Sequence, residues 1–159
     1  MISKHTDGKF YAAPISGYFI SMQLKSYEDH VKTVKKSVDI MKDTKTALQS
    51  KDADERLIAA TIVVGKYRSQ KAPNPNKEEP IDAAESKLIL DAIATAKWQK
   101  VTFGQPNPQT LFYQLGITAK DGWTAPMQAT PENMRDAVQA WVKDHGDYRI
   151  KRFVPGESK

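Results

Sequence analysis

The chain has 159 residues, of which 40% are hydrophobic and 27% charged, and these are ordinary values for a folded globular protein. They argue against a fully disordered chain and against a membrane protein. The longest nearly uncharged run, residues 10–24, is interrupted by Pro14 and Gly17 and is shorter than the roughly 20 residues that span a bilayer. We predict a single domain over residues 1–159, because a chain of this length can bury a core without disulfides or metals.

The net charge of +5 is too small and too dispersed to indicate a nucleic-acid-binding protein. Residues 1–70 contain 12 basic and 8 acidic side chains, and residues 71–159 contain 12 and 11. Lysines and acids alternate along the first half instead of separating onto different faces. We therefore do not expect a nucleic-acid partner.

The chain contains no cysteine, which excludes disulfides, thiolate metal sites and cysteine nucleophiles. An oxidising compartment penalises stray thiols, so this absence slightly favours an exported or periplasmic protein over a cytoplasmic one. Residues 1–24 do not resemble a signal peptide, because Asp7 lies in the segment that should be positive and no small-x-small cleavage site follows Met22. If the protein is exported, we expect its signal to have been removed already.

Residues 1–25 are rich in aromatic side chains and lack a helical period. Phe10, Tyr11, Tyr18 and Phe19 are the prominent members. The segment could form two short strands around a turn or an extended arm. Aromatic side chains left in water would form an adhesive patch, so we expect them to pack on their own domain or on a neighbouring protein. These four residues are candidates for an interaction site.

A helix is predicted from Ser26 onward, with a narrow apolar seam on an otherwise polar, lysine-rich surface. Its residues follow one another in alternating steps of four and three, and they are Tyr27, Val31, Val34, Val38, Met41 and Leu48. Lys45 occupies the one position in this series that is not apolar. Such a seam needs a partner. A second helix is predicted over residues 52–68, starting with Asp52 and Glu55 in a capping-box pattern. Its apolar residues surround most of its circumference, which indicates a central core helix.

Residues 47–60, with an acidic turn, an arginine and paired alanines, resemble the beginning of a single HEAT-type helix. The wider helical region is similar to helical domains of uncharacterised exported bacterial proteins. No further HEAT-like repeats follow in the sequence. The resemblance implies helical structure, and it brings no activity and no functional residues.

The second half begins with a proline-rich segment, residues 69–80, which we predict to be an exposed loop within the domain. A helix is expected from Asp82 as N-cap to Trp98, and a short one from Asn107 as cap to an exit at Gly116. Asp121-Gly122 should form a turn.

The last predicted helix starts at Thr130 and stops at Gly146. Residues 148–154 alternate apolar and basic side chains, which is typical of a strand. Its expected partner is the aromatic N-terminal segment. The predicted fold is therefore mostly α, with four to five packed helices and a small β element that pairs the N-terminal segment with residues 148–154.

We find no catalytic motif and no pattern of metal ligands or cofactor-binding residues. His145 lies between Asp144 and Asp147, but Gly146 explains this cluster as the C-terminus of a helix, where a partly positive imidazole suits the dipole. The acidic groups around residues 52–55 and 78–85 lie at helix starts, where carboxylates cap amides. We therefore predict no catalytic residues, no metal, no cofactor and no enzymatic activity.

Two other groups of side chains are candidates for binding. Trp98, Trp123 and Trp141 could border a pocket for a flat ligand, although such groups more often form core. The second group is basic and could contact a polyanion or add to the sheet of a neighbour; it consists of Arg149, Lys151 and Arg152. The alternation of apolar and basic side chains already explains these residues as the solvent-exposed face of an edge strand.

The function that we expect from the sequence is a non-catalytic protein-interaction or scaffolding module, with a protein partner or self-association. One alternative is a small-ligand-binding or enzyme-accessory domain with a tryptophan-rich pocket. A second alternative is weak binding of polyanions or nucleic acid through the basic strand.

Overall fold

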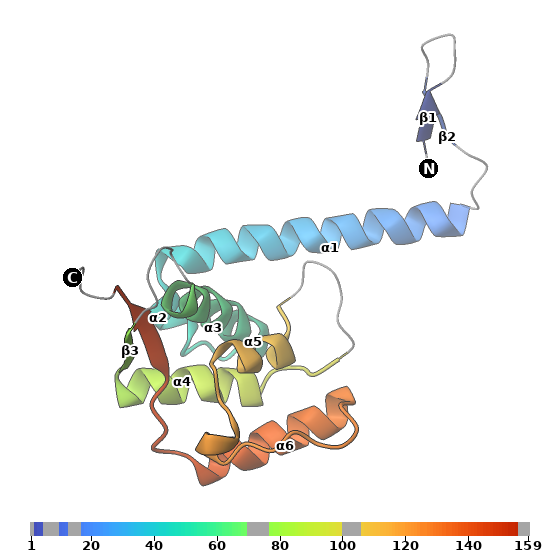
Figure 1. The fold of residues 1–159 in the computed structure, drawn as a ribbon. Helices are drawn as coiled ribbons and strands as arrows, with labels where there is room; N and C mark the ends of the chain where they lie inside the picture. Colours follow the sequence, from blue (N-terminus) through green and yellow to red (C-terminus); the bar gives the residue numbers. More distant parts are fainter. Residues whose placement is uncertain (1, 5–9, 13–16, 70–76, 100–105, 156–159) are drawn as a thin grey trace. The chain divides into compact units, whose positions relative to one another are not determined.

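The computed structural model describes residues 2–4, 10–12, 17–69, 77–99 and 106–155. Its helices are α1 (Gly17–Lys42), α2 (Thr44–Ala47), α3 (Ala53–Arg68), α4 (Ala83–Ala94), α5 (Pro108–Gln114) and α6 (Pro131–Asp144). Its strands are β1 (Ile2–Lys4), β2 (Phe10–Ala12), β3 (Lys77–Pro80) and β4 (Lys151–Val154), and a 3-10 turn, η1, spans Ala119–Asp121. The mostly helical class with a small antiparallel sheet is confirmed (Figure 1).

The chain divides into two compact units, Met1–Lys35 and Lys36–Lys159. The first contains an antiparallel pair of strands, with Ile2 of β1 opposite Ala12 of β2, and the first part of α1. The helix begins nine residues before the predicted start at Ser26, so residues 17–25 are neither a strand nor an extended arm. The sequence explains the early start, because Ile20 and Leu24 continue the four-and-three spacing of the seam.

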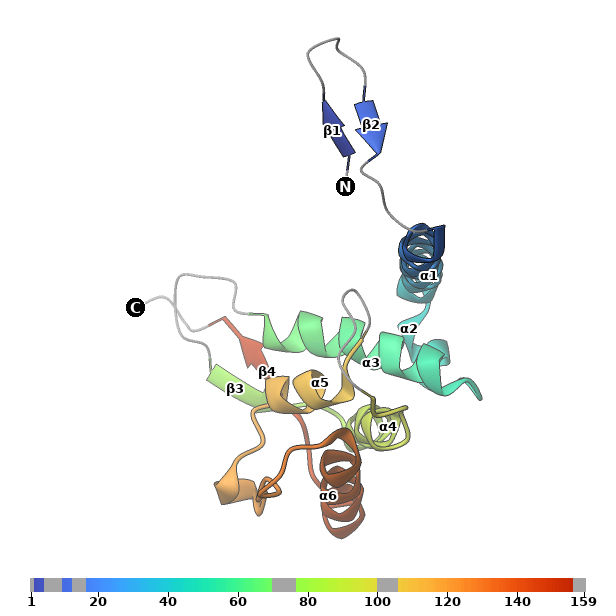
Figure 2. The same cartoon turned by 90° about the vertical axis from the view of Figure 1, so that its right-hand side faces the viewer.

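The second unit is built around α4, which lies between α3 and α6, while α5 packs on both α3 and α4 (Figures 1 and 2). These helices close a single apolar core. Its fully enclosed side chains include Val64, Ile89, Ile93, Phe112, Met134 and Val138. The α3 helix carries six buried residues, as expected of a central core helix.

The predicted helix starts are confirmed by their capping bonds. The side chains of Asp52, Asp82, Asn107 and Thr130 each accept hydrogen bonds from backbone N–H groups in the first turn of α3, α4, α5 and α6. Glu55 does not complete the predicted capping box, because its carboxylate accepts the Ser50 hydroxyl at 2.5 Å instead.

The predicted first helix ends earlier than its seam. Asp43 interrupts it, and the Asp43 carboxylate accepts hydrogen bonds from the Thr46 backbone N–H at 3.0 Å and the Thr46 hydroxyl at 2.6 Å. These bonds start α2 as a separate short helix. The break removes Leu48 from the line of the seam, and Leu48 is buried in the core.

The strand predicted at residues 148–154 forms as β4, but its partner is β3 and not the N-terminal segment. The pairing is antiparallel and places Glu79 opposite Arg152. Beyond the strands, the Ile81 N–H donates to the Ile150 carbonyl at 2.8 Å. The predicted pairing with the N-terminal segment was wrong because it relied on aromatic β propensity. This backbone bond, together with the Arg68 hydrogen bonds to the Glu78 carboxylate and the Lys151 carbonyl, instead holds the Lys-Glu-Glu-Pro segment beside β4. Residues 70–76 of the predicted loop lie outside the described residues.

Candidate interaction surface

The most exposed apolar surface on a described helix is the face of α1 that carries the predicted seam. The Tyr27, Val34, Val38 and Met41 side chains are 68%, 47%, 53% and 65% exposed, and Val31 between them is partly exposed. We call these five residues the α1 seam. Burying a large apolar side chain lowers the free energy, so a contiguous line of exposed ones is a candidate binding surface.

Within the second unit, residues 36–42 at the end of α1 pack on the core by the other side of the helix. Ile40 is buried in the core, and the Lys36 ammonium lies 2.7 Å from the Asp52 carboxylate and 3.8 Å from that of Glu55. On a helix with 100° per residue, Ile40 and Lys36 lie roughly 150° from the midline of Val38 and Met41. Within the second unit, the end of α1 is therefore held by one side and presents Val38 and Met41 of the seam on the other.

The Lys36 and Asp52 charges stabilise each other. Their hydrogen bond is the main cause that raises the pKa of Lys36 and lowers the pKa of Asp52, although burial works in the opposite sense for both. Asp52 also accepts the Asp54 N–H at 2.8 Å as the cap of α3. One carboxylate thus starts α3 and ties it to α1.

The four aromatic residues predicted as interaction sites lie in the first unit. Phe10 and Tyr11 belong to β2, and Tyr18 and Phe19 belong to the first turn of α1. Their side chains lie outside the described part of the structure, so their role stays a prediction.

The basic residues of the C-terminal strand are partly engaged within the fold. The Arg149 Nε donates to the Ile81 carbonyl at 2.7 Å, and the Arg152 guanidinium lies 3.7 Å from the Glu79 carboxylate. Of the three basic residues, Arg149 and Arg152 therefore already bind groups of this protein, and Lys151 is exposed. Polyanion binding stays an alternative.

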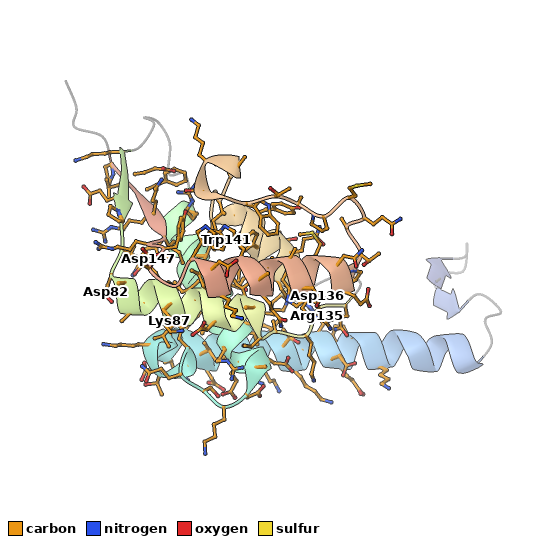
Figure 3. All side chains as sticks on the ribbon, turned by 90° about the horizontal axis from the view of Figure 1, so that it is seen from below. Asp82, Lys87, Arg135, Asp136, Trp141 and Asp147 are labelled. Carbon is orange, nitrogen blue, oxygen red and sulfur yellow. The ribbon has the colours of Figure 1, made fainter. Side chains whose placement is uncertain are left out.

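Two of the three tryptophans lie in the core. The Phe112 ring contacts Trp123 and Trp141 edge-on, with centroids 4.6 and 5.8 Å apart. The Trp141 indole N–H donates to the Asp121 carbonyl at 2.9 Å, and Trp98 is partly buried with its N–H on the Ile93 carbonyl. Figure 3 labels Trp141 on α6. Packing explains these positions without a ligand, and a pocket bordered by all three stays a prediction.

His145 caps the C-terminal end of α6. Its ring stacks on Trp141 with centroids 4.4 Å apart, and its Nδ1 lies 2.8 Å from the Trp141 carbonyl. Burial raises the pKa of the neighbouring Tyr148 to about 12. Within the described ranges no group of three or more His, Asp or Glu side chains is placed to hold a metal ion.

An open groove of about 370 Å³ lies among α2, α3 and α4. Its apolar lining includes Leu48, Val63 and Leu88. The acidic groups on it already serve the fold, because Asp82 caps α4 and Glu85 accepts the Tyr67 hydroxyl at 2.9 Å. The groove therefore lacks uncommitted acidic groups that could orient a ligand.

The sequence identified the seam but not its exposure. The available indication was its narrowness, since strict four-and-three spacing is typical of a helix that meets one other helix, whereas α3 is apolar around most of its circumference. None of the helices in the described ranges has the length and apolarity to cross a bilayer. Comparisons with protein-family models, curated proteins and solved structures found no match.

Proposed function

We propose that this protein is a non-catalytic protein-interaction or scaffolding module that binds a partner helix through the α1 seam. The observation that carries the proposal is the exposure of Tyr27, Val34, Val38 and Met41 along one helix. Leaving this line in water costs free energy that a protein partner would recover.

The spacing of the seam favours a helix as the partner. Apolar residues that repeat in steps of four and three present knobs that fit holes formed by the side chains of a facing helix. A convex helix face, in contrast, cannot enclose a small molecule, which normally needs a concave site. Within the second unit, the buried Ile40 side chain anchors the end of α1 while Val38 and Met41 stay exposed.

A photo-crosslinking amino acid at position 38 tests this function in cells that make the full chain. We expect protein adducts from position 38, because the Val38 side chain belongs to the seam and is exposed. The matched control is position 32, since Lys32 lies on the same helix with an exposed side chain but is not part of the seam. Mass spectrometry of the adducts identifies the partner.

Adducts that depend on position 38 support the module, whether the partner is another protein or another copy. Equal adduct yields at both positions would indicate collision and not binding. Absence of protein adducts from position 38 would contradict the proposed function, provided that circular dichroism shows the labelled chain folded.

A further inference from the structure

We propose that the α1 seam is occupied by the α1 seam of a second copy of this chain, with the two helices antiparallel. This inference rests on the proposed function and names its partner. In the coiled-coil heptad, Val31 and Val38 occupy a positions, and Tyr27, Val34 and Met41 occupy d positions.

The spacing of four seam residues is the same in both directions along the helix. Positions 27, 31, 34 and 38 are separated by four, three and four residues, and the order is the same in both directions. An antiparallel pair can therefore place Tyr27 of one copy against Val38 of the other and Val31 against Val34. Each layer then joins an a residue to a d residue, which is the layer composition that an antiparallel pair requires. The interface is isologous, as expected of a two-fold dimer.

The charges beside the seam select the antiparallel direction. Glu28 and Lys35 both occupy e positions, and both side chains are exposed. In the antiparallel register, e positions face e positions, so Glu28 of each copy lies beside Lys35 of the other. Two-fold symmetry produces this opposite-charge pair twice.

A parallel pair would lack these attractive contacts. There each g residue faces the e residue five positions later in the other helix, which places His30 beside Lys35 and Ser37 beside Lys42. Neither combination joins opposite charges. Heptad spacing alone permits both directions, and charge complementarity favours the antiparallel one.

Disulfide trapping tests the direction, and the chain has no native cysteine to interfere. We expect a mixture of Tyr27→Cys and Val38→Cys chains, carrying different tags, to form the mixed disulfide under mild oxidation. Neither variant alone should dimerise efficiently, because 11 residues of helix separate equivalent cysteines by about 16 Å along the axis. Lys32→Cys is the control for random collision. Both seam sites are exposed, so the variants should keep the wild-type circular dichroism spectrum.

A charge exchange provides a second test, with different outcomes for the two directions. In the antiparallel dimer Lys35→Glu replaces two attractive pairs with two repulsive ones, so its dissociation constant should rise roughly tenfold in sedimentation equilibrium. The double variant Glu28→Lys, Lys35→Glu should restore the wild-type value. In a parallel dimer Lys35→Glu would face His30 instead of Glu28, so no like-charge pair would form and the dissociation constant should stay near the wild-type value.

Homodisulfides from each single variant, or a dissociation constant of Lys35→Glu that stays at the wild-type value, would overturn the antiparallel proposal. A chain that remains monomeric at about 100 µM and forms no disulfide above the Lys32→Cys control would overturn self-association altogether. These outcomes are distinct from a failure of the proposed function. Adducts of position 38 with a different protein would support the proposed function and contradict self-association.

Discussion

At the scale of single residues, Arg68 at the end of α3 binds groups on several different elements of the fold. Its Nε donates to the Gln114 carbonyl and its Nη1 to the Lys151 carbonyl, both at 3.1 Å. The same nitrogen lies 2.9 Å from the Glu78 carboxylate, and the guanidinium covers the Phe153 ring at 4.0 Å. One planar cation thus connects α3, the end of α5 and both strands of the C-terminal sheet.

Replacing Arg68 with Met should therefore destabilise the fold by about 2 kcal/mol, because charge-assisted bonds to two carbonyls and a carboxylate are lost together. The measurement is urea unfolding followed by circular dichroism. Arg152→Met is the control, since Arg152 is half exposed and its ion pair with Glu79 is long. We expect that control to lose less than about 0.5 kcal/mol. Equal losses in the two variants would show that Arg68 does not tie these elements together.

Arg68 also lies close to Gly116, where the backbone conformation and the available space both favour glycine. Its φ of +72° lies in the left-handed region, which strains residues with a side chain. A Cβ at this position would also lie 2.6 Å from the Arg68 Nη2. The predicted exit of α5 is confirmed, but the close approach of Arg68, 48 positions earlier in the chain, could not be deduced from local sequence.

At the scale of elements, the contact between α1 and α3 depends on the charge of Asp52. Its pKa is lowered mainly by the hydrogen bond from Lys36 and next by the Asp54 N–H. A carboxyl group whose pKa is lower in the folded state stabilises the fold above its unfolded pKa, and that contribution is lost as the pH falls through the folded pKa. The raised pKa of Lys36 has the complementary effect, with full stabilisation below 10.5 and loss as the pH rises through its folded value.

Asp52→Asn isolates this charge, because asparagine remains a good N-cap. Near neutral pH the variant should be less stable than the wild type by under about 1 kcal/mol, since both partners are a third to a half exposed and screened by water. The difference should shrink as the pH falls below 3.8, where the wild-type carboxylate also becomes protonated. Unfolding by urea at several pH values measures it. A difference that does not change with pH would mean that the cap, and not the ion pair, carries the effect.

At the scale of the whole molecule, the solvent accessibility of the three tryptophans distinguishes core packing from a tryptophan-lined pocket. Trp123 and Trp141 are buried against Phe112, whereas Trp98 is partly exposed. We expect acrylamide to quench Trp98 preferentially, so Trp98→Phe should leave emission that is quenched roughly several-fold less than in the urea-unfolded chain. Strong quenching that persists in Trp98→Phe would show that solvent reaches Trp123 or Trp141 and would support the pocket alternative.

The sequence predicted those parts of the fold that depend on neighbours along the chain. Asp52, Asp82, Asn107 and Thr130 were identified as helix caps because a cap needs only its own side chain and the next two or three amides. The seam could be found for the same reason, since its spacing is a property of one helix. The absence of cysteine likewise follows from the sequence alone.

Only the tertiary structure decided which surfaces meet. The pairing of β4 with Lys77–Pro80 depends on the Arg68 hydrogen bond to the Lys151 carbonyl and on the Ile81–Ile150 backbone bond, which bring together residues about 70 to 80 positions apart. The exposure of Val38 and Met41 depends on Ile40 and Lys36, which anchor the opposite side of the same helix within the second unit. Local pattern fixes which face of a helix is apolar, but the free energy of packing the remaining elements determines whether that face is covered by its own chain or left for a partner.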